Sequence, residues 1–191
     1  MLEKILSLDT QLFVYLNGLG SETYDGLWLI ITKMTNWIPL FLLLFYLIFK
    51  KIGAKQTLLL LFFVAVLIAF TDQTTNLVKN SVQRLRPCNN PEIKSIIRIV
   101  KVSNSFSFFS AHASNTMAVA TFLFLLFRRY YKYLGLLFLW PLIFAYSRIY
   151  LGLHYPLDIV SGYLFGFVIG FLMFKIYRKV QSRYFPMDST V

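Results

Sequence analysis

Residues Thr57 to Asn76 read TLLLLFFVAVLIAFTDQTTN, an apolar run that carries one charged side chain near its end. This is roughly the length that an α-helix needs to cross a bilayer. The whole chain is 58% hydrophobic and only 14% charged, which is more apolar than a soluble domain. Four further apolar stretches lie at about 27–49, 113–127, 133–146 and 157–176. The pattern predicts an all-α fold: one polytopic membrane helix bundle over residues 1–191, with five spans.

The N-terminal residues 2–23 have a different pattern. Apolar side chains such as Ile5 and Leu12 are interspersed with charged and amide side chains such as Lys4 and Asn17. This mixture is typical of an amphipathic helix that lies in the membrane interface instead of crossing it. Because the segment lacks a long apolar core before a small-residue cleavage site, we expect no removable signal peptide.

Lysine and arginine residues in the short loops predict the orientation. The net charge is +11, and three basic clusters follow alternate spans. They are Lys50, Lys51 and Lys55; then Arg128, Arg129 and Lys132; then Lys175, Arg178, Lys179 and Arg183. Alternation of the spans places all three clusters on one side, which the positive-inside rule assigns to the cytoplasm. We interpret the positive charge as a topology signal, and we expect no nucleic-acid partner.

Three polar islands interrupt the apolar sequence. They extend from Lys79 to Pro87, from Phe109 to His112 and from Ser147 to Asp158. Alternation of the spans brings all three to the side opposite the basic clusters. The islands contain four cationic side chains, several hydroxyl groups, both histidines of the chain and one carboxylate. Preorganised cations and hydrogen-bond donors are the main means of stabilising a phosphoryl group in transfer, so the islands predict a phosphate-handling site.

Each candidate residue has a role that follows from its chemistry. The cations Lys79, Arg86 and Arg148 are predicted to bind phosphate. Ser110 and the backbone N–H groups near Ala111, at the start of a helix, are expected to donate further hydrogen bonds. No cluster of carboxylates accompanies the islands, which favours a mechanism without a metal and without a cofactor.

The two histidines are predicted to carry the chemistry. Asp158 lies four residues after His154, and Pro156 is expected to occupy the first position of a helix. The carboxylate is then close enough to accept a hydrogen bond from Nδ1 and to leave Nε2 free to attack phosphorus. His112 has no acidic residue within four positions, so it is predicted to protonate the departing oxygen.

At these residues the chain resembles the type 2 phosphatidic acid phosphatase superfamily. The family pattern is Lys, six residues, Arg-Pro; then Pro-Ser-Gly-His; then Ser-Arg, five residues, His, three residues, Asp. Lys79, Arg86 and Pro87 match the first part, and the third part matches from Ser147 to Asp158. In the middle part Phe109 stands for the proline and Ala111 for the glycine.

The resemblance implies a six-helix membrane fold and the same residue roles. By that likeness Lys79, Arg86, Ser110 and Arg148 bind phosphate, while His154 is the phosphohistidine nucleophile. The resemblance also implies a bacterial inner-membrane protein with its active site on the periplasmic face. Family members act on undecaprenyl diphosphate, phosphatidylglycerol phosphate or the lipid A 1-phosphate, and we expect undecaprenyl diphosphate to be the substrate here.

Other functions remain open at this point. A phosphotransferase that passes the phosphoryl group to another lipid would use the same phosphohistidine. A non-catalytic lipid-binding protein is disfavoured because both histidines and Asp158 are intact. A haloperoxidase is disfavoured because those proteins are large and soluble. Apart from membrane lipids and a lipid phosphate substrate, we expect no obligate protein partner.

Overall fold

The computed structural model describes residues 1–184, and these form six α-helices and three short 3₁₀ helices without any strand. The α-helices are α1 (Leu2–Gly18), α2 (Glu22–Ile31), α3 (Ile38–Val82), α4 (Ala111–Phe127), α5 (Leu139–Tyr150) and α6 (Pro156–Tyr184). The 3₁₀ helices are η1 (Met34–Trp37), η2 (Pro87–Asn89) and η3 (Leu134–Phe138). The predicted all-helical fold is confirmed.

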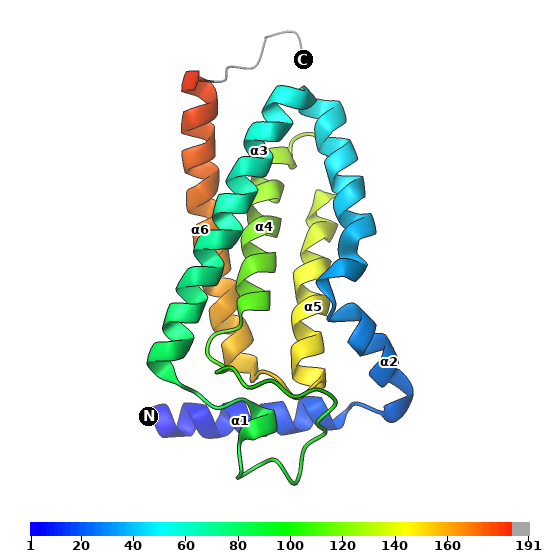
Figure 1. Cartoon of the computed structure of the whole chain (residues 1–191), viewed down its shortest axis with the longest axis vertical. Coiled ribbons are helices and arrows are strands. Elements are labelled where there is room, and N and C mark those ends of the chain that lie inside the picture. Colours follow the sequence, from blue (N-terminus) through cyan, green and yellow to red (C-terminus); the bar gives the residue numbers. More distant parts are fainter. Residues whose placement is uncertain (185–191) are drawn as a thin grey trace.

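Helix α3 consists of two limbs that meet at Gly53, where the chain folds back (Figure 1). Gly53 has φ 73° and ψ 175°, a conformation that favours glycine because other residues carry a Cβ that clashes there. The two limbs therefore correspond to two of the predicted spans. The helical segment Met34–Asn89 and helix α6 are long and apolar enough to cross a membrane, while 111–127 and 134–150 are shorter apolar helices.

The first predicted span, 27–49, differs from the structure at its start. Residues up to Ile31 belong to α2, and a new helix begins only after η1. The reason lies in two side chains that follow α2. The Asn36 Nδ2 donates to the carbonyl of Ile30 at 2.7 Å, and the Trp37 Nε1 donates to that of Ile31 at 2.9 Å. These bonds satisfy the last carbonyl groups of α2 and end that helix.

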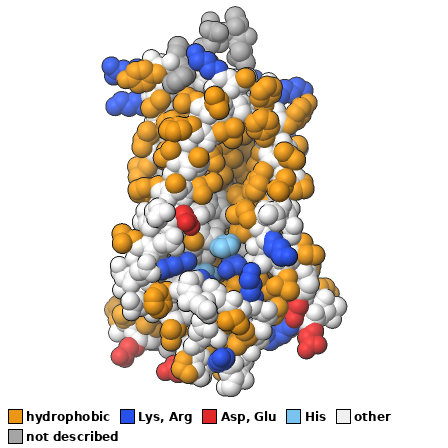
Figure 2. Space-filling model, viewed as in Figure 1, with side chains coloured by type: hydrophobic (Ala, Val, Ile, Leu, Met, Phe, Trp, Pro, Cys, Tyr) orange, Lys and Arg blue, Asp and Glu red, His pale blue; other side chains and the backbone are white. Residues whose placement is uncertain are grey.

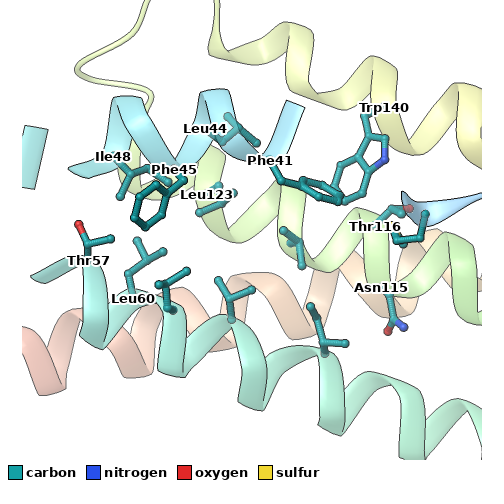
Figure 3. Close-up of a pocket in the computed structure, with 15 residues that line it drawn as sticks. Phe41, Leu44, Phe45, Ile48, Thr57, Leu60, Asn115, Thr116, Leu123 and Trp140 are labelled. Atoms are coloured by element: carbon teal, nitrogen blue, oxygen red, sulfur yellow. The ribbon is translucent and has the colours of Figure 1, made fainter. Parts of the chain in front are cut away.

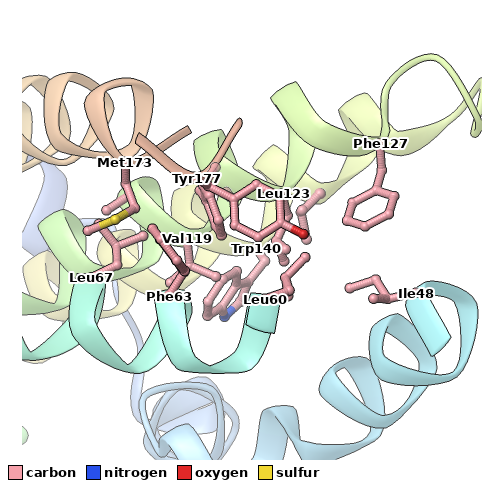
Figure 4. Packing of buried hydrophobic residues seen from close by; sticks show 14 of the residues in the cluster. Ile48, Leu60, Phe63, Leu67, Val119, Leu123, Phe127, Trp140, Met173 and Tyr177 are labelled. Carbon is pink, nitrogen blue, oxygen red and sulfur yellow. The ribbon is translucent and has the colours of Figure 1, made fainter. Parts of the chain in front are cut away.

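Helix α4 lies at the centre of the bundle and packs most closely against α6. Gly162, Gly166 and Gly170 recur every fourth residue along α6, on the face where it touches the backbone of α4. Aliphatic and aromatic side chains from α3, α4 and α6 then fill the space around this contact, as Figure 4 shows for Phe63, Val119 and Tyr177. The close contact holds the first turns of α4 and α6, which carry two of the islands, next to each other.

The three basic clusters share one end of the bundle, as predicted. The Lys51 ammonium group lies 4.6 Å from the centroid of the Tyr130 ring, which joins the first cluster to the second. Near the third cluster, the Gln181 Nε2 donates to the Gln56 Oε1 at 3.3 Å. The opposite end is formed by the segment 83–110 and the turn 151–155 (Figure 1). Which side of the membrane each end faces stays a prediction.

Helix α1 lies crosswise below the other helices, at the end opposite the basic clusters (Figure 1). It presents exposed leucine and isoleucine side chains on one face, and it buries Asp9, Phe13 and Asn17 on the other. The Asn17 Nδ2 donates to the carbonyl groups of Arg98, Ile149 and Tyr150 at 3.0–3.1 Å. The predicted amphipathic helix is therefore present, and Asn17 binds it to the end of α5 and to Arg98 of the segment 83–110.

Candidate active site

All the sequence-predicted site residues come from the island end, which α1 underlies. In the first island, Lys79 lies in the last turn of α3 and Arg86 lies directly before η2. In the second, Ser110 and His112 lie at the start of α4. In the third, Arg148 lies in the last turn of α5, His154 in the turn that follows and Asp158 in the first turn of α6. Helix α6 begins at Pro156 as predicted, because proline needs no N–H partner at that position.

His154 and Asp158 form the predicted pair. The distance from His154 Nδ1 to Asp158 Oδ2 is 3.3 Å, and both side chains are buried. On the other side of the ring, Arg86 Nη1 lies 2.9 Å from His154 Nε2. A guanidinium group can only donate, so Nε2 is the accepting nitrogen and Nδ1 carries the proton. Nε2 is thus the nitrogen with a lone pair available to phosphorus once a phosphate takes up the Arg86 donor.

The surroundings of His154 favour its neutral form. Burial lowers the pKa of His154 well below 6.5, and the nearby positive charges of Arg86, Arg148 and Lys79 lower it further. A protonated imidazole has no lone pair on Nε2 and could not attack phosphorus. The ring is therefore ready to act as a nucleophile at neutral pH.

Asp158 has three further donors that the sequence analysis did not identify as site residues. The Ser107 hydroxyl and the backbone N–H of Tyr155, the latter at 2.9 Å, donate to Oδ2, the oxygen that faces His154. The Arg84 Nη1 donates to Oδ1 at 2.7 Å. With both oxygens bound in this way, the carboxylate has no freedom to rotate away from the imidazole.

Arg84 also binds a second carboxylate, which comes from a distant part of the chain. Its Nη2 lies 2.6 Å from Asp9 Oδ2, and Asp9 belongs to the crosswise helix α1. Burial raises the pKa of Asp9, and the hydrogen bonds from Arg84 and from the N–H of Leu157 act in the opposite direction. Arg84 was visible in the first island as one of its cations, whereas only the buried face of α1 identifies Asp9.

The three predicted phosphate-binding cations are buried without an ionic partner. Within residues 1–184, none of Lys79, Arg86 and Arg148 forms a salt bridge. Arg86 is held by the carbonyl and hydroxyl groups of Ser105 at 2.7 and 2.8 Å. Buried cations are costly unless a negative charge compensates them, so this cluster fits an anion.

The hydrogen bonds of the Arg148 guanidinium group also fit a site for an anion. Its Nη1 donates to the Thr32 hydroxyl at 2.8 Å, which fixes the guanidinium group against the end of α2. Its Nε is buried and has no hydrogen-bond partner among the described residues. A buried N–H without an acceptor is rare, and a phosphate oxygen would supply the missing acceptor.

The start of α4 provides the remaining donors. Ser110 is the N-cap of this helix, and its hydroxyl accepts from the N–H of Ala113 at 3.4 Å. The N–H of Ser110 donates to the carbonyl of Asp158 at 3.0 Å, which ties α4 to α6. The first turn, including Ala111, leaves backbone N–H groups without intrahelical acceptors. A helix start of this kind favours an anion, so the predicted role of Ser110 and Ala111 in phosphate binding stays a prediction.

His112 lies in this first turn and is half-buried. Its ring stacks on that of Phe144, with the centroids 5.2 Å apart and an interplanar angle of 28°. Phe109, at the position of the family proline, is buried and packs against Phe165 of α6 at a centroid distance of 5.0 Å.

In Figure 2 the histidine side chains are visible just below the apolar belt, with lysine and arginine side chains close by. The site thus opens at the edge of the region that lipid tails would cover.

The sequence is similar to those of known phosphatases. A model of the PAP2 superfamily matches residues 56–182. A lipid A 4'-phosphatase of Bacteroides thetaiotaomicron is 35% identical over 189 residues, covering 96% of this chain and 83% of that protein. An undecaprenyl-diphosphatase of Sulfolobus acidocaldarius is 30% identical over 180 residues, covering 91% and 81% respectively.

Two solved structures are similar in fold. One is a transmembrane PAP2 type phosphatidylglycerolphosphate phosphatase from Bacillus subtilis, with a TM-score of 0.71 and 18% identity over 96% of this chain and 90% of that one. The other is Aquifex aeolicus LpxE, with a TM-score of 0.65 and 24% identity over 88% and 95%. At such identities the likeness concerns the fold, and it confirms the predicted helical membrane architecture.

Proposed function

The chain belongs to the PAP2 superfamily of membrane lipid phosphatases, and from this premise we propose that it hydrolyses a lipid phosphate through a phosphohistidine at His154, without a metal ion. One observation carries the proposal. Three buried cations without salt-bridge partners in residues 1–184 surround an imidazole whose Nε2 bears the lone pair. This arrangement suits a phosphoryl group whose charge the cations neutralise and whose phosphorus the imidazole attacks.

The reaction would proceed in two steps. His154 Nε2 forms a bond to phosphorus while the bond from phosphorus to the lipid oxygen breaks, and His112 gives its proton to that oxygen. In the second step His112 takes a proton from water, and the hydroxide oxygen displaces Nε2 to release inorganic phosphate. Asp158 keeps the His154 ring oriented and stabilises the positive charge that the ring acquires, as in the triads of hydrolases.

An apolar cavity beside the site supports a lipid as the substrate. The cavity has a volume of about 380 Å³ and lies between the two limbs of α3, α4 and Trp140 of α5. As Figure 3 shows, Asn115 and Thr116 lie at one end of it, while Ile48 and Thr57 lie at the other. The first two residues follow His112 by one helical turn, so the cavity leads away from the site along the bundle. A hydrocarbon chain bonded to the phosphate would find apolar surroundings there.

Two lipid substrates have specific support. The relative at 35% identity is named a lipid A 4'-phosphatase, and the relative at 30% identity is named an undecaprenyl-diphosphatase. We place the 4'-phosphate of lipid A first because of the higher identity and coverage of that relative. Undecaprenyl diphosphate, the substrate expected from the sequence, is the second candidate.

A panel of lipids tests the proposal. The purified protein in detergent would receive lipid A, undecaprenyl diphosphate and phosphatidylglycerol phosphate, each with EDTA present. We expect phosphate release that vanadate inhibits, and mass spectrometry should locate the loss from lipid A at the 4' position. Activity that disappears in EDTA and returns with Mg²⁺ would contradict the metal-independent mechanism. Transfer of phosphate to an added lipid alcohol faster than to water would favour a phosphotransferase.

The nucleophile is tested separately with His154→Ala. This variant should lose turnover and should form no covalent phosphoenzyme in rapid-quench experiments with labelled substrate. A melting temperature close to that of the wild type would verify that the variant is folded. If it kept a tenth of the wild-type activity, His154 would not be the nucleophile.

A further inference from the structure

Asp9 is a buried charge on a helix whose exposed face is apolar. Its neighbours Leu8 and Leu12 are 55% and 47% exposed, whereas Asp9 is 7% exposed. Its two oxygens are both engaged: Oδ2 accepts from Arg84 Nη2 at 2.6 Å, and Oδ1 accepts from the N–H of Leu157 at 2.7 Å. A carboxylate buried in this way is stable only with its partners in place, so the three groups form a unit.

Arg84 connects this carboxylate to the one beside the nucleophile. Its Nη2 binds Asp9, and its Nη1 binds Asp158 Oδ1 at 2.7 Å. The guanidinium group also lies over the Tyr155 ring, 3.9 Å from the centroid. A guanidinium group is planar and rigid, so its two terminal nitrogens cannot move independently. The position of Asp9 therefore determines how Arg84 meets Asp158.

The same carboxylate of Asp158 orients His154 through its other oxygen. We propose that Asp9 is a positioning residue, which acts through Arg84 to hold the Asp158 carboxylate in the geometry that orients the His154 imidazole. The inference rests on the proposed role of His154. It assigns to the crosswise helix α1 a part in the reaction, although α1 contributes no group that touches the phosphate.

The charges explain why removal of Asp9 would slow the reaction. Arg84 shares its positive charge between two carboxylates, and without Asp9 that charge acts on Asp158 alone. Asp158 would then bind Arg84 more strongly and accept less well from His154 Nδ1. The imidazole would lose orientation and basicity, and both losses reduce the rate of attack by Nε2. Misplacements of this kind, remote from the reacting atoms, cost about tenfold to hundredfold in rate.

The test uses the purified full-length protein in detergent with p-nitrophenyl phosphate, whose small leaving group makes no demand on the lipid-facing surface of α1. In Asp9→Asn, kcat/KM per active site, which reports the attack by Nε2, should fall about tenfold to hundredfold. Active sites are counted by vanadate titration, so that a merely unstable variant is not mistaken for a slow one. The Ki of inorganic phosphate should stay within about twofold of the wild-type value, because phosphate forms no bond to Nε2 when it binds and the phosphate-binding cations are unchanged.

A double-mutant cycle locates the effect. If Asp9 acts through Arg84, the Asp9→Asn/Arg84→Gln enzyme should be no slower than Arg84→Gln alone, within about twofold. The matched control is Asp25→Asn, which breaks the ion pair of Asp25 with Arg98 at 2.9 Å on the neighbouring helix α2. Neither residue contacts His154 or Asp158, so kcat/KM per active site should stay within about twofold of wild type even if the melting temperature falls.

Two results would overturn the inference. One is a kcat/KM per titrated site in Asp9→Asn that equals that of Asp25→Asn, and the other is a loss in the double variant that equals the product of the single losses. If Asp9→Asn does not fold, Arg84→Lys replaces it. A single ammonium group keeps the buried charge but cannot hold both carboxylates in the same geometry, so a wild-type kcat/KM there would equally refute the inference. An active His154→Ala would instead refute the proposed function.

Discussion

The two histidines differ in what surrounds their rings, and that difference predicts different responses to substrate. His154 is bound on both ring nitrogens, whereas His112 lies in the first turn of α4 with its ring stacked on that of Phe144. If His112 protonates the departing oxygen, His112→Ala should lose about 10²- to 10⁴-fold in kcat/KM on a lipid phosphate. The loss on p-nitrophenyl phosphate should be much smaller, because p-nitrophenolate leaves without a proton.

The comparison uses kcat/KM because this parameter reports the step that forms the phosphoenzyme and not its later hydrolysis. His154→Ala is the control, since it should lose activity on both substrates alike. Equal losses on both substrates in His112→Ala would assign His112 to phosphate binding.

At the scale of residues, the sequence could predict a candidate site because its polar side chains are concentrated in three short islands. The structure brings Lys79, Arg86, Arg148 and the two histidines to one end of the bundle. Ser107 and Asp9 were missed for a physical reason. Each acts through a contact with a residue far away in sequence, and neither lies in a pattern whose spacing indicates that contact. Only the three-dimensional structure can pair such residues.

At the scale of helices, the contact between α4 and α6 depends on glycine. A Cβ added at Gly170 would lie 2.5 Å from the carbonyl oxygen of Ala118, a separation that requires the two backbones to move apart. We expect Gly170→Ala to lower the free energy of unfolding by about 1–3 kcal/mol, as overpacking of a tight contact does. The measurement is the thermal melting temperature of the purified protein in detergent.

Gly26→Ala is the matched control, because α2 leaves nothing within 4 Å of a Cβ at that position. Alanine is the better helix former, so this variant should melt at the wild-type temperature or slightly above it. A Gly170→Ala protein that melts with the control would show that the two helices can separate at little cost.

Helix boundaries were harder to predict than helix existence. The five apolar stretches predicted the limbs of α3 and the helices α4, α5 and α6, because hydrophobicity over such lengths has few other causes. The apolar pattern at 27–49 could not reveal the break between α2 and α3. That break depends on hydrogen bonds from Asn36 and Trp37 to two carbonyl groups, and a hydropathy pattern does not record such bonds.

At the scale of the whole molecule, charge is distributed unequally between the two ends. Ten of the nineteen lysine and arginine residues lie in the three clusters at the end where α3 folds back. Most of the others lie at the site end, where Lys79, Arg86 and Arg148 are explained by phosphate binding and Arg84 and Arg98 by ion pairs. The positive-inside rule therefore applies most directly to the clusters and predicts that they face the cytoplasm.

Cysteine labelling in intact cells tests this orientation. The native Cys88 is only 1% exposed, so a maleimide would not reach it, and Cys88→Ala supplies a background without thiols. In that background we place one cysteine at Glu92, an exposed position of the site end, or at Lys132, an exposed position of the basic end.

With the outer barrier made permeable, a membrane-impermeant maleimide should label Glu92→Cys at once and Lys132→Cys only after the inner membrane is lysed. Both variants must keep phosphatase activity, which verifies that the orientation measured is that of the folded enzyme. The reverse pattern would place the site in the cytoplasmic leaflet, and the enzyme would then act on lipid phosphates before their export instead of after it.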